Sequence, residues 1–210
     1  MSNTIEIYGQ IGWEVTPGEV RRQVAAADPA APLEVKLHTP GGSVMDGIAI
    51  LTNLRGHPAG FQVQIDGLAA SMGAVIAVAA DRVTMSADGW LMFHRVKGGG
   101  GTAKELREQA AIQEKMETGM ILRLLKAEMP GLESEDAVLA ALDSELWIDG
   151  PTALKFGFVD ELLPGRAMAA CWRGGNWDFC PEAVTSTYLD KTGVRTTTDP
   201  TSAPFLIFAR

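Results

Sequence analysis

Apolar and polar residues alternate along several short stretches, which is the pattern of β-strands with one buried face. The predicted strands are Thr4–Tyr8, Leu33–Thr39, Phe61–Asp66, Arg82–Met85, Trp90–His94, Leu146–Ile148 and Phe158–Leu162. Between them, apolar residues recur with helical spacing behind helix-start residues. The predicted helices run from Thr16 to about Ala27, from Ser43 through Arg55, directly after Asp66, from Thr102 to Met129, from Glu133 to Leu142 and from Thr152. This alternation of strands and helices predicts an α/β domain.

The character of the sequence changes after Pro164 and Gly165. Residues 1–165 contain all of the predicted strands and helices, and we interpret them as one domain. Residues 166–210 are rich in Thr, Gly and Pro and have no sustained periodicity. We therefore expect this segment to be an extended or partly disordered tail.

The chain of 210 residues has a net charge of −8 and an isoelectric point near 4.9. Nucleic acids and anionic membranes are bound through clustered Lys and Arg, and no basic cluster is present, so neither partner is expected. The longest apolar stretch, Ala69–Ala80, is shorter than the ~20 residues of a membrane-spanning helix. The start of the chain has no basic segment followed by an apolar block, so we expect no secretory signal and a cytoplasmic protein.

Both cysteines, Cys171 and Cys180, lie in the predicted tail. Without a secretory signal we expect free thiols rather than a disulfide. A zinc site would need two further ligands, and no other Cys or His is nearby. We expect neither a metal nor another cofactor.

Ser71 is a candidate nucleophile because it lies in a run of small residues, Ala69–Gly73, where a strand turns into a helix. Backbone N–H groups at such a junction are unpaired and can hold an oxyanion. The Gly-rich stretch TPGGS, residues 39–43, closes another strand and offers more N–H groups. The simpler interpretations are that Ser71 only caps a helix and that TPGGS is a plain turn.

A serine hydroxyl needs a general base at neutral pH, and the sequence has three histidines. We expect His57 to lie in a solvent-exposed loop and His38 to lie at a strand end beside the Gly-rich turn. His94 ends an apolar strand just before a run of glycines, where an imidazole is expected for hydrogen bonding or catalysis.

Taken in order, four segments resemble the proteolytic subunit of the Clp protease, ClpP. They are TPGGSVMDGIAI, DGLAASMGA, LMFH and LWIDGPTALKFGFVDEL, which match the family patterns SPGG, G-x-AASMGA, x-MIH and a final A-x-x-x-G-x-VD. The resemblance extends from about residue 4 to residue 163. It implies the ClpP/crotonase-like spiral of strand and helix repeats, with a long handle helix, and a serine endopeptidase activity.

The resemblance implies a role for each matching position. Ser71 matches the family nucleophile and His94 matches the general base, and the backbone N–H groups of Gly42 and Met72 match the oxyanion hole. This set is chemically coherent, because an imidazole can take the serine proton while two N–H donors receive the developing negative charge.

The orienting acid is where this sequence departs from the family pattern. Counting back from the shared Val159 and Asp160 leads to Glu145, where the family has Asp. Glu can orient His94 as Asp does, with the reach of one more methylene. Asp143 is the first alternative and Asp149 the second; any of the three can also be an ordinary solvated carboxylate.

The resemblance also makes residues 102–129 the handle helix through which two rings interlock. One face of this segment carries an apolar stripe that polar residues interrupt. It has more apolar positions than contact with a single core requires, and it consists of Leu106, Ala110, Gln113, Glu117, Ile121, Leu124 and Leu125. The preceding glycines Gly98, Gly99 and Gly100 would let a substrate strand pair edge-on, although a flexible linker is the simpler interpretation. We expect homo-oligomeric rings, with seven subunits each and possibly stacked.

Other differences refine the subfamily. The family usually has Pro two residues after the catalytic His, whereas this chain reads HRVKGGGG. The start IEIYGQIGW, the compact SVMDGIAILTNLRGHPAG and the Glu before Trp147 are more similar to the ClpP-related proteases of tailed phages and prophages. Those proteases cleave scaffold and capsid proteins without an unfoldase, in the host cytoplasm or the procapsid. The alternatives are a housekeeping ClpP that works with an ATPase, a crotonase-like acyl-CoA enzyme, a Ser–Lys protease with Lys97 or Lys104 as base, and a non-catalytic ring scaffold.

Overall fold

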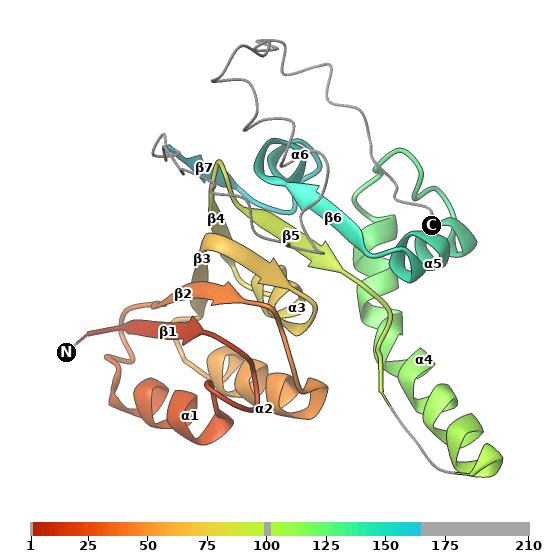
Figure 1. Ribbon diagram of the computed structural model, residues 1–210. Helices are drawn as coiled ribbons and strands as arrows, with labels where there is room; N and C mark the ends of the chain where they lie inside the picture. Colours follow the sequence, from red (N-terminus) through yellow and green to blue (C-terminus); the bar gives the residue numbers. More distant parts are fainter. Residues whose placement is uncertain (1, 99–101, 165–210) are drawn as a thin grey trace, which may run out of the picture. The chain divides into compact units, whose positions relative to one another are not determined.

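The computed structural model of the chain describes residues 2–98 and 102–164. Strands and helices alternate along this part of the chain (Figure 1). The strands are β1 Thr4–Tyr8, β2 Leu33–Thr39, β3 Phe61–Ala70, β4 Arg82–Ser86, β5 Trp90–Phe93, β6 Leu146–Asp149 and β7 Glu161–Leu163. The helices are α1 Pro17–Ala26, α2 Val44–Arg55, α3 Met72–Ala77, α4 Ala103–Leu125, α5 Glu135–Asp143 and α6 Gly150–Lys155.

The strands form one sheet in which β3 has two neighbours on the same edge. The order β1-β2-β3-β4-β7 is parallel throughout. The first half of β3, Gln62–Ile65, pairs with β4, whereas Leu68–Ala70 pair with β5. β5 also pairs with β6 in the antiparallel sense. The end of β3 is thereby separated from β4 and brought beside the end of β5.

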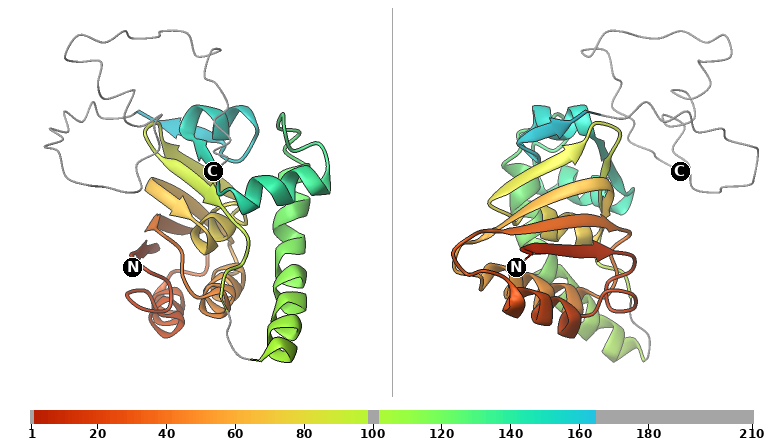
Figure 2. Two further views of the ribbon diagram at one scale, coloured as in Figure 1. Left: turned by 45° about the vertical axis from the view of Figure 1, so that its right-hand side comes forward. Right: turned by 90° about the vertical axis from the view of Figure 1, so that its left-hand side faces the viewer.

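Helices α1, α2 and α3 cover one face of the sheet (Figure 2). In β2 every second residue is buried and the intervening residues are exposed, so the opposite face of these strands is polar. The α/β class predicted from the alternating segments is confirmed, and the parallel sheet with its long helix α4 is consistent with the ClpP/crotonase fold.

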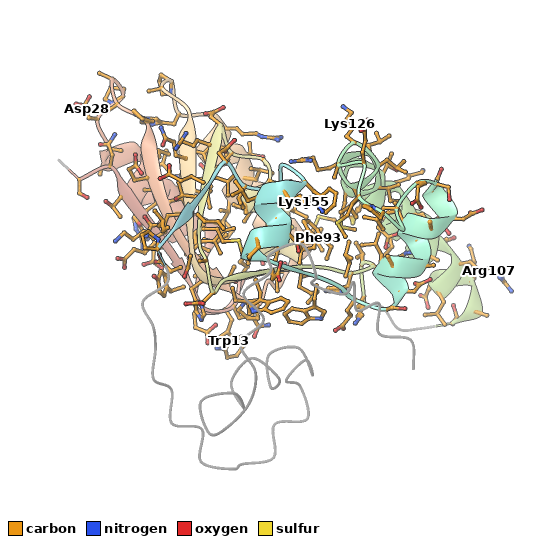
Figure 3. The ribbon with its side chains drawn as sticks, turned by 90° about the horizontal axis from the view of Figure 1, so that it is seen from above. Trp13, Asp28, Phe93, Arg107, Lys126 and Lys155 are labelled. Atoms are coloured by element: carbon orange, nitrogen blue, oxygen red, sulfur yellow. The ribbon has the colours of Figure 1, made fainter. Side chains whose placement is uncertain are left out.

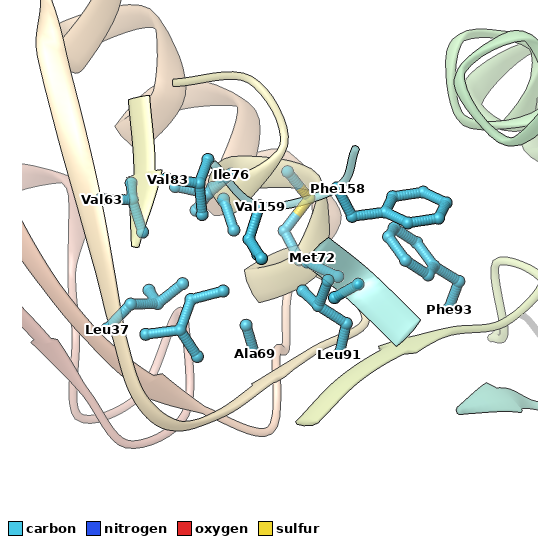
Figure 4. Packing of buried hydrophobic residues seen from close by; sticks show 14 of the residues in the cluster. Leu37, Val63, Ala69, Met72, Ile76, Val83, Leu91, Phe93, Phe158 and Val159 are labelled. Atoms are coloured by element: carbon cyan, nitrogen blue, oxygen red, sulfur yellow. The ribbon is translucent and has the colours of Figure 1, made fainter. Parts of the chain in front are cut away.

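The core lies between the sheet and these helices and extends to Phe158 and Val159 (Figure 4). The rings of Phe93 on β5 and Phe158, which follows α6, are 5.9 Å apart and tilted, an arrangement worth roughly 0.5–1.5 kcal/mol beyond the burial of the two rings. Met72 packs against Gly47 so closely that a Cβ on that glycine would lie 2.1 Å from the Met72 side chain. The first residue of α3 is therefore fixed by α2.

Helix α4 begins with a capping box in which Thr102 and Glu105 bond to each other's backbone N–H. Its second half packs on the core through Ile121 and Leu124. Its first half is exposed, and Arg107 points away from the sheet (Figure 3). The exposed apolar side chains of α4 are Leu106, Ile112 and Leu122.

The prediction that β3 ends at Asp66 and a helix follows directly is wrong. The strand continues through Ala70, and the helix is limited to Met72–Ala77. The alanines of this segment favour a helix locally. Here the pairing of Leu68–Ala70 with β5 makes them a strand.

Two other predicted boundaries shift. Helix α4 ends at Leu125 rather than Met129. The strand predicted from Phe158 begins only at Glu161, because the N–H groups of Phe158 and Val159 bond to the Ala153 carbonyl and complete the end of α6.

The prediction that His57 is solvent-exposed is also wrong. The side chain is 6% exposed, and its Nε2 lies 2.9 Å from the Ala31 carbonyl oxygen. The loop of His57 packs on the loop before β2, and this partner is remote in sequence, so the loop composition around His57 could not reveal it.

The predicted tail, residues 166–210 with Cys171 and Cys180, lies outside the described residues. Among the helices that the structure describes, none is long and apolar enough to cross a membrane. In the same part of the chain, no three His, Cys, Asp or Glu side chains gather as metal ligands.

Candidate active site

Ser71 occupies a strained turn between β3 and α3. Its φ is 53° and its ψ is −121°, values that residues other than glycine rarely adopt. Its N–H donates to the Met92 carbonyl at 2.8 Å, which fixes the turn to β5. Its hydroxyl makes no capping bond to α3. The geometry is that of a displayed hydroxyl at a strand-to-helix turn rather than of a helix cap.

A pocket of about 490 Å³ opens beside this turn. Ser71, Met72 and His94 line it together with the Gly-rich turn Pro40–Gly42. Parallel pairing of Ala70 with Met92 explains the proximity, because it places the residues after β3 beside those after β5. The pocket wall is otherwise largely apolar and includes Val44, Ile48, Val75, Met116 and Met120.

Two backbone N–H groups of this pocket lack acceptors. Among the described residues, neither the Gly42 nor the Met72 N–H has a hydrogen-bond partner. Gly41, which follows β2, lies against Ser71, since a Cβ on Gly41 would lie 2.6 Å from the Ser71 Cβ. The adjacent Gly41 N–H is held by the Thr39 hydroxyl at 3.0 Å. The Gly-rich turn thus leaves the Gly42 donor free next to Ser71.

His94 follows β5 and is partly buried. Its Nδ1 is buried without a hydrogen-bond partner in the described part of the chain. Burial of the imidazole, and then the positive charge of Lys97, lower the pKa of His94 below its ordinary value of 6.5. The imidazole is therefore held in the neutral form, which can accept a proton.

Glu145 lies next to His94 across the β5–β6 pair. The antiparallel register ends with Phe93 opposite Leu146, so His94 and Glu145 directly adjoin this last pair, and their charges act on each other. Glu145 has a φ of 60°, a second strained non-glycine residue in this region. Its carboxylate accepts a hydrogen bond from Lys97 Nζ at 2.8 Å, and this bond lowers the pKa of Glu145. The carboxylate is thus ionised and turned toward Lys97.

The two alternative acids have other partners. Asp143 is largely exposed, and its Oδ1 lies 3.6 Å from Arg95 Nη1. Asp149 caps α6 by accepting the Thr152 N–H at 2.9 Å, and it pairs with Trp90 at the far end of β5. By position, Glu145 is the carboxylate best placed to reach His94.

The glycine run is only partly within the described residues. Gly98 has a φ of 132°, and its carbonyl accepts from Gln113 Nε2 at 2.7 Å. Gly99 and Gly100 lie outside the described residues. Of the two lysines considered as bases, Lys97 lines the pocket but bonds to Glu145, and Lys104 lies on the exposed part of α4 beside Glu108.

The sequence interpretation assigned no role to Glu117, which also lines the pocket. It is buried and binds both Arg95 and Val96, the two residues after His94. Its only sequence signal is that a charged residue interrupts the apolar stripe of the long helix at a core-facing position.

Together these groups supply what acyl transfer from a carbonyl needs. A displayed hydroxyl, a neutral imidazole and two free N–H donors surround one pocket. The charge of the Glu145 carboxylate acts on the imidazole. The set corresponds to a nucleophile, a base, an oxyanion hole and an orienting acid.

Comparison with known proteins agrees with this chemistry. The sequence model described as Clp protease matches residues 2–166. The chain is similar to the ATP-dependent Clp protease proteolytic subunits of Streptococcus pneumoniae strains Hungary19A-6, 70585 and JJA. Each is 31% identical to it over 146 residues, which cover 68% of this chain and 74% of the relative.

Replacing Lys97 with Met should raise the pKa of His94, because a positive charge that disfavours the imidazolium is removed. The neutral imidazole then persists to lower pH in the wild-type protein than in the variant. NMR titration of the His94 ring, assigned by its loss in His94→Ala, measures the change. Lys104→Met is the matched control and should leave the titration in place; an unchanged His94 pKa in Lys97→Met would contradict the expectation.

Proposed function

The chain belongs to the Clp protease family and is a serine peptidase of that family, and from this premise we propose that Ser71, His94 and Glu145 are its catalytic triad. The main support is the strained turn that displays Ser71 beside His94 and the two free N–H groups of Gly42 and Met72. The proposed activity is endopeptidase hydrolysis of protein or peptide chains.

In the proposed reaction, His94 removes the proton from the Ser71 hydroxyl as its oxygen attacks the carbonyl carbon of the scissile peptide bond. The carbonyl oxygen becomes an oxyanion and accepts hydrogen bonds from the Gly42 and Met72 N–H groups. The tetrahedral intermediate collapses, the C–N bond breaks, and the imidazolium gives its proton to the leaving amine. Water, activated by the same imidazole, then releases the acyl group from Ser71.

Glu145 would orient the imidazole and stabilise its charged form. This role requires the carboxylate to accept a hydrogen bond from His94 Nδ1, which is buried without a partner in the described residues. Glu145 now bonds to Lys97 instead, so a rotation of its side chain would complete the triad. Its position beside the last β5–β6 pair and the action of its charge on His94 support this assignment over Asp143, which lies near Arg95.

The lining of the pocket also supports a preference of the enzyme for substrates with apolar side chains. Ile48, Val75, Met116 and Met120 form an apolar wall beside Ser71, which suits an apolar side chain next to the cleaved bond. The substrate main chain would pair with the backbone of the glycine run that begins at Gly98, as Gly99 and Gly100 were predicted to allow.

We further propose that the protein assembles into homo-oligomeric rings, with seven subunits each and possibly stacked. The support is that Leu106 and Ile112 on the first half of α4 are exposed, and a contact between copies of this helix would bury them. The tail, residues 166–210, is proposed as a segment separate from this domain.

The narrower proposal is a phage or prophage protease that matures procapsids by cutting scaffold or capsid proteins in the host cytoplasm or procapsid. Two sequence departures support it, Val96 where the family usually has Pro and Glu145 where it usually has Asp. The alternative is a housekeeping peptidase that works with an ATPase. An acyl-CoA enzyme or a bare scaffold would have no use for Ser71 and His94 in one pocket.

A fluorophosphonate probe should form one adduct on Ser71, because only a base-activated serine reacts readily with it. Peptide mass mapping locates the adduct, and Ser71→Ala should abolish it. His94→Ala should slow labelling roughly 10²–10⁴-fold, the usual contribution of a general base. His38→Ala, at an exposed histidine outside the pocket, is the control. An oligomer that carries no label, or a label on another residue, would contradict the proposal.

Glu145→Gln should lower kcat for a fluorogenic peptide by roughly 10³–10⁴-fold, as expected when the carboxylate that orients a triad histidine becomes an amide. Asp143→Asn makes the same chemical change two residues earlier and should change kcat by less than about threefold, as for an exposed carboxylate with a weak ion pair. The opposite pattern would assign the acid to Asp143.

Negative charges introduced on the first half of α4 should disrupt the assembly. Sedimentation velocity of the double variant Leu106→Glu and Ile112→Glu should show smaller species than the wild-type protein, because burying two unpaired carboxylates in a helix contact is unfavourable. Circular dichroism should stay unchanged, since both positions are exposed. Arg107→Glu is the matched control on the same helix. Equal sedimentation of variant and wild-type would contradict the proposed interface.

A further inference from the structure

The side chain of Lys97 connects the pocket with the candidate acid of the triad. Lys97 lines the pocket that contains Ser71 and His94, and its Nζ donates to Glu145 Oε1 at 2.8 Å. His94 Nδ1, the atom that an orienting carboxylate would bind, is buried and has no partner in the described residues. One carboxylate thus has two candidate donors, and in this structure the lysine holds it.

The Glu145 carboxylate interacts with both donors. The hydrogen bond from Lys97 is the largest cause of the lowered pKa of Glu145, and the charge of His94 lowers that pKa as well. In return, the charge of Glu145 raises the pKa of His94, against the larger effects of burial and of Lys97. The Glu145 backbone is held at the end of α5, since its N–H donates to the Leu142 carbonyl at 3.3 Å. The change of partner is therefore a rotation of the Glu145 side chain.

The ion pair of Lys97 with Glu145 is open to exchange. The side chain of Lys97 is 62% exposed and that of Glu145 is 24% exposed. Ion pairs of this kind contribute little to stability, because water screens the charges and two long side chains must be ordered. The other ion pair beside His94 differs, since its carboxylate, Glu117, is 2% exposed and bonds to Arg95. A ligand can therefore separate Lys97 from its partner far more readily than Arg95.

Separation of this pair changes the charge that the pocket presents. When Glu145 turns to His94, Lys97 remains in the pocket wall without its anion. The other cationic side chain of the wall, Arg95, stays paired with Glu117. A carboxylate bound in the pocket would pair with Lys97 and favour this arrangement, because a ligand stabilises the state to which it binds better.

We propose that Lys97 binds an acidic side chain of the substrate and thereby releases Glu145 to orient His94. The substrate class is a peptide with Asp or Glu close to the cleaved bond. The carboxylate belongs to a side chain rather than to the end of a peptide, because an endopeptidase cuts within a chain. The inference rests on the proposed peptidase function and deepens it.

Two effects of Lys97 follow from this role. Without an acidic substrate, Lys97 competes with His94 for Glu145, so its removal should raise kcat for an uncharged peptide. With an acidic substrate, Lys97 supplies a contact, so its removal should abolish the advantage of that peptide over an uncharged one. A lysine that only attracted acidic peptides would alter KM for the acidic peptide and leave kcat for the uncharged one in place.

The test uses internally quenched peptides in pairs that differ only by Glu or Gln at one position on either side of the cleaved bond. The pH lies above the pKa of His94 in every variant, so that the imidazole is neutral throughout. In the wild-type protein, Glu at one position should raise kcat about two- to fivefold over Gln, the scale of a partly exposed ion pair. Lys97→Met should raise kcat for the Gln peptide by a similar factor and remove the preference for Glu.

Two further variants are controls. Lys97→Arg keeps the positive charge and should keep the preference for Glu. Lys104→Met removes a lysine that lies beside Glu108 on the exposed part of α4, and it should change neither peptide. Sedimentation velocity checks that every variant assembles as the wild-type protein does.

A double-mutant cycle with Glu145→Gln shows whether Lys97 acts through the acid. Activity in this background is low and is measured at higher enzyme concentration; there Lys97→Met should not raise kcat. An increase in this background, no increase in the single variant, or no preference for Glu at any position overturns the proposal. If the wild-type protein cuts no peptide and a phosphonate does not label Ser71, the peptidase assignment itself fails. A labelled Ser71 with cleavage but without these differences refutes the role of Lys97 alone.

Discussion

The division of β3 between two partners is the constraint on which the site depends. Its first half pairs with β4 and its second half with β5, both in the parallel sense and within one sheet. The chain must then turn sharply into α3, and Ser71 takes up this turn with a positive φ while its N–H is tied to the Met92 carbonyl. The same pairing fixes where β5 ends, and hence where His94 lies. One pattern of main-chain hydrogen bonds thereby positions both the hydroxyl and the imidazole.

The sequence predicts the features that depend on local interactions and misses those that depend on partners remote in sequence. The alternation in Leu33–Thr39 and the cap at Thr16 are local, and both elements form as expected. Ser71, His94 and Gly42 could be found because short motifs mark them, and the structure gathers them in one pocket. The strand at Leu68–Ala70 could not be predicted, because its alanines favour a helix locally and the decisive partner is β5.

Side-chain partners remote in sequence explain the remaining differences. Burial of His57 depends on Ala31, and burial of Glu117 depends on Arg95 and Val96. The orientation of Glu145 toward Lys97 is another such contact. Two ion pairs thus flank His94, one formed by Arg95 with Glu117 and one by Lys97 with Glu145. The two pairs contribute two positive and two negative charges, and the pKa of His94 is lowered because burial and the charge of Lys97 outweigh the two carboxylates.

The two halves of helix α4 lie in different environments. Its second half supplies Met116, Glu117 and Met120 to the pocket, and its first half presents Leu106 and Ile112 to solvent. In the proposed ring, one helix would join the substrate pocket to the contact between subunits. Any effect of subunit association on peptide affinity would then be matched by an equal effect of bound peptide on association, because such coupling is reciprocal. The apparent affinity for substrate would in that case depend on protein concentration.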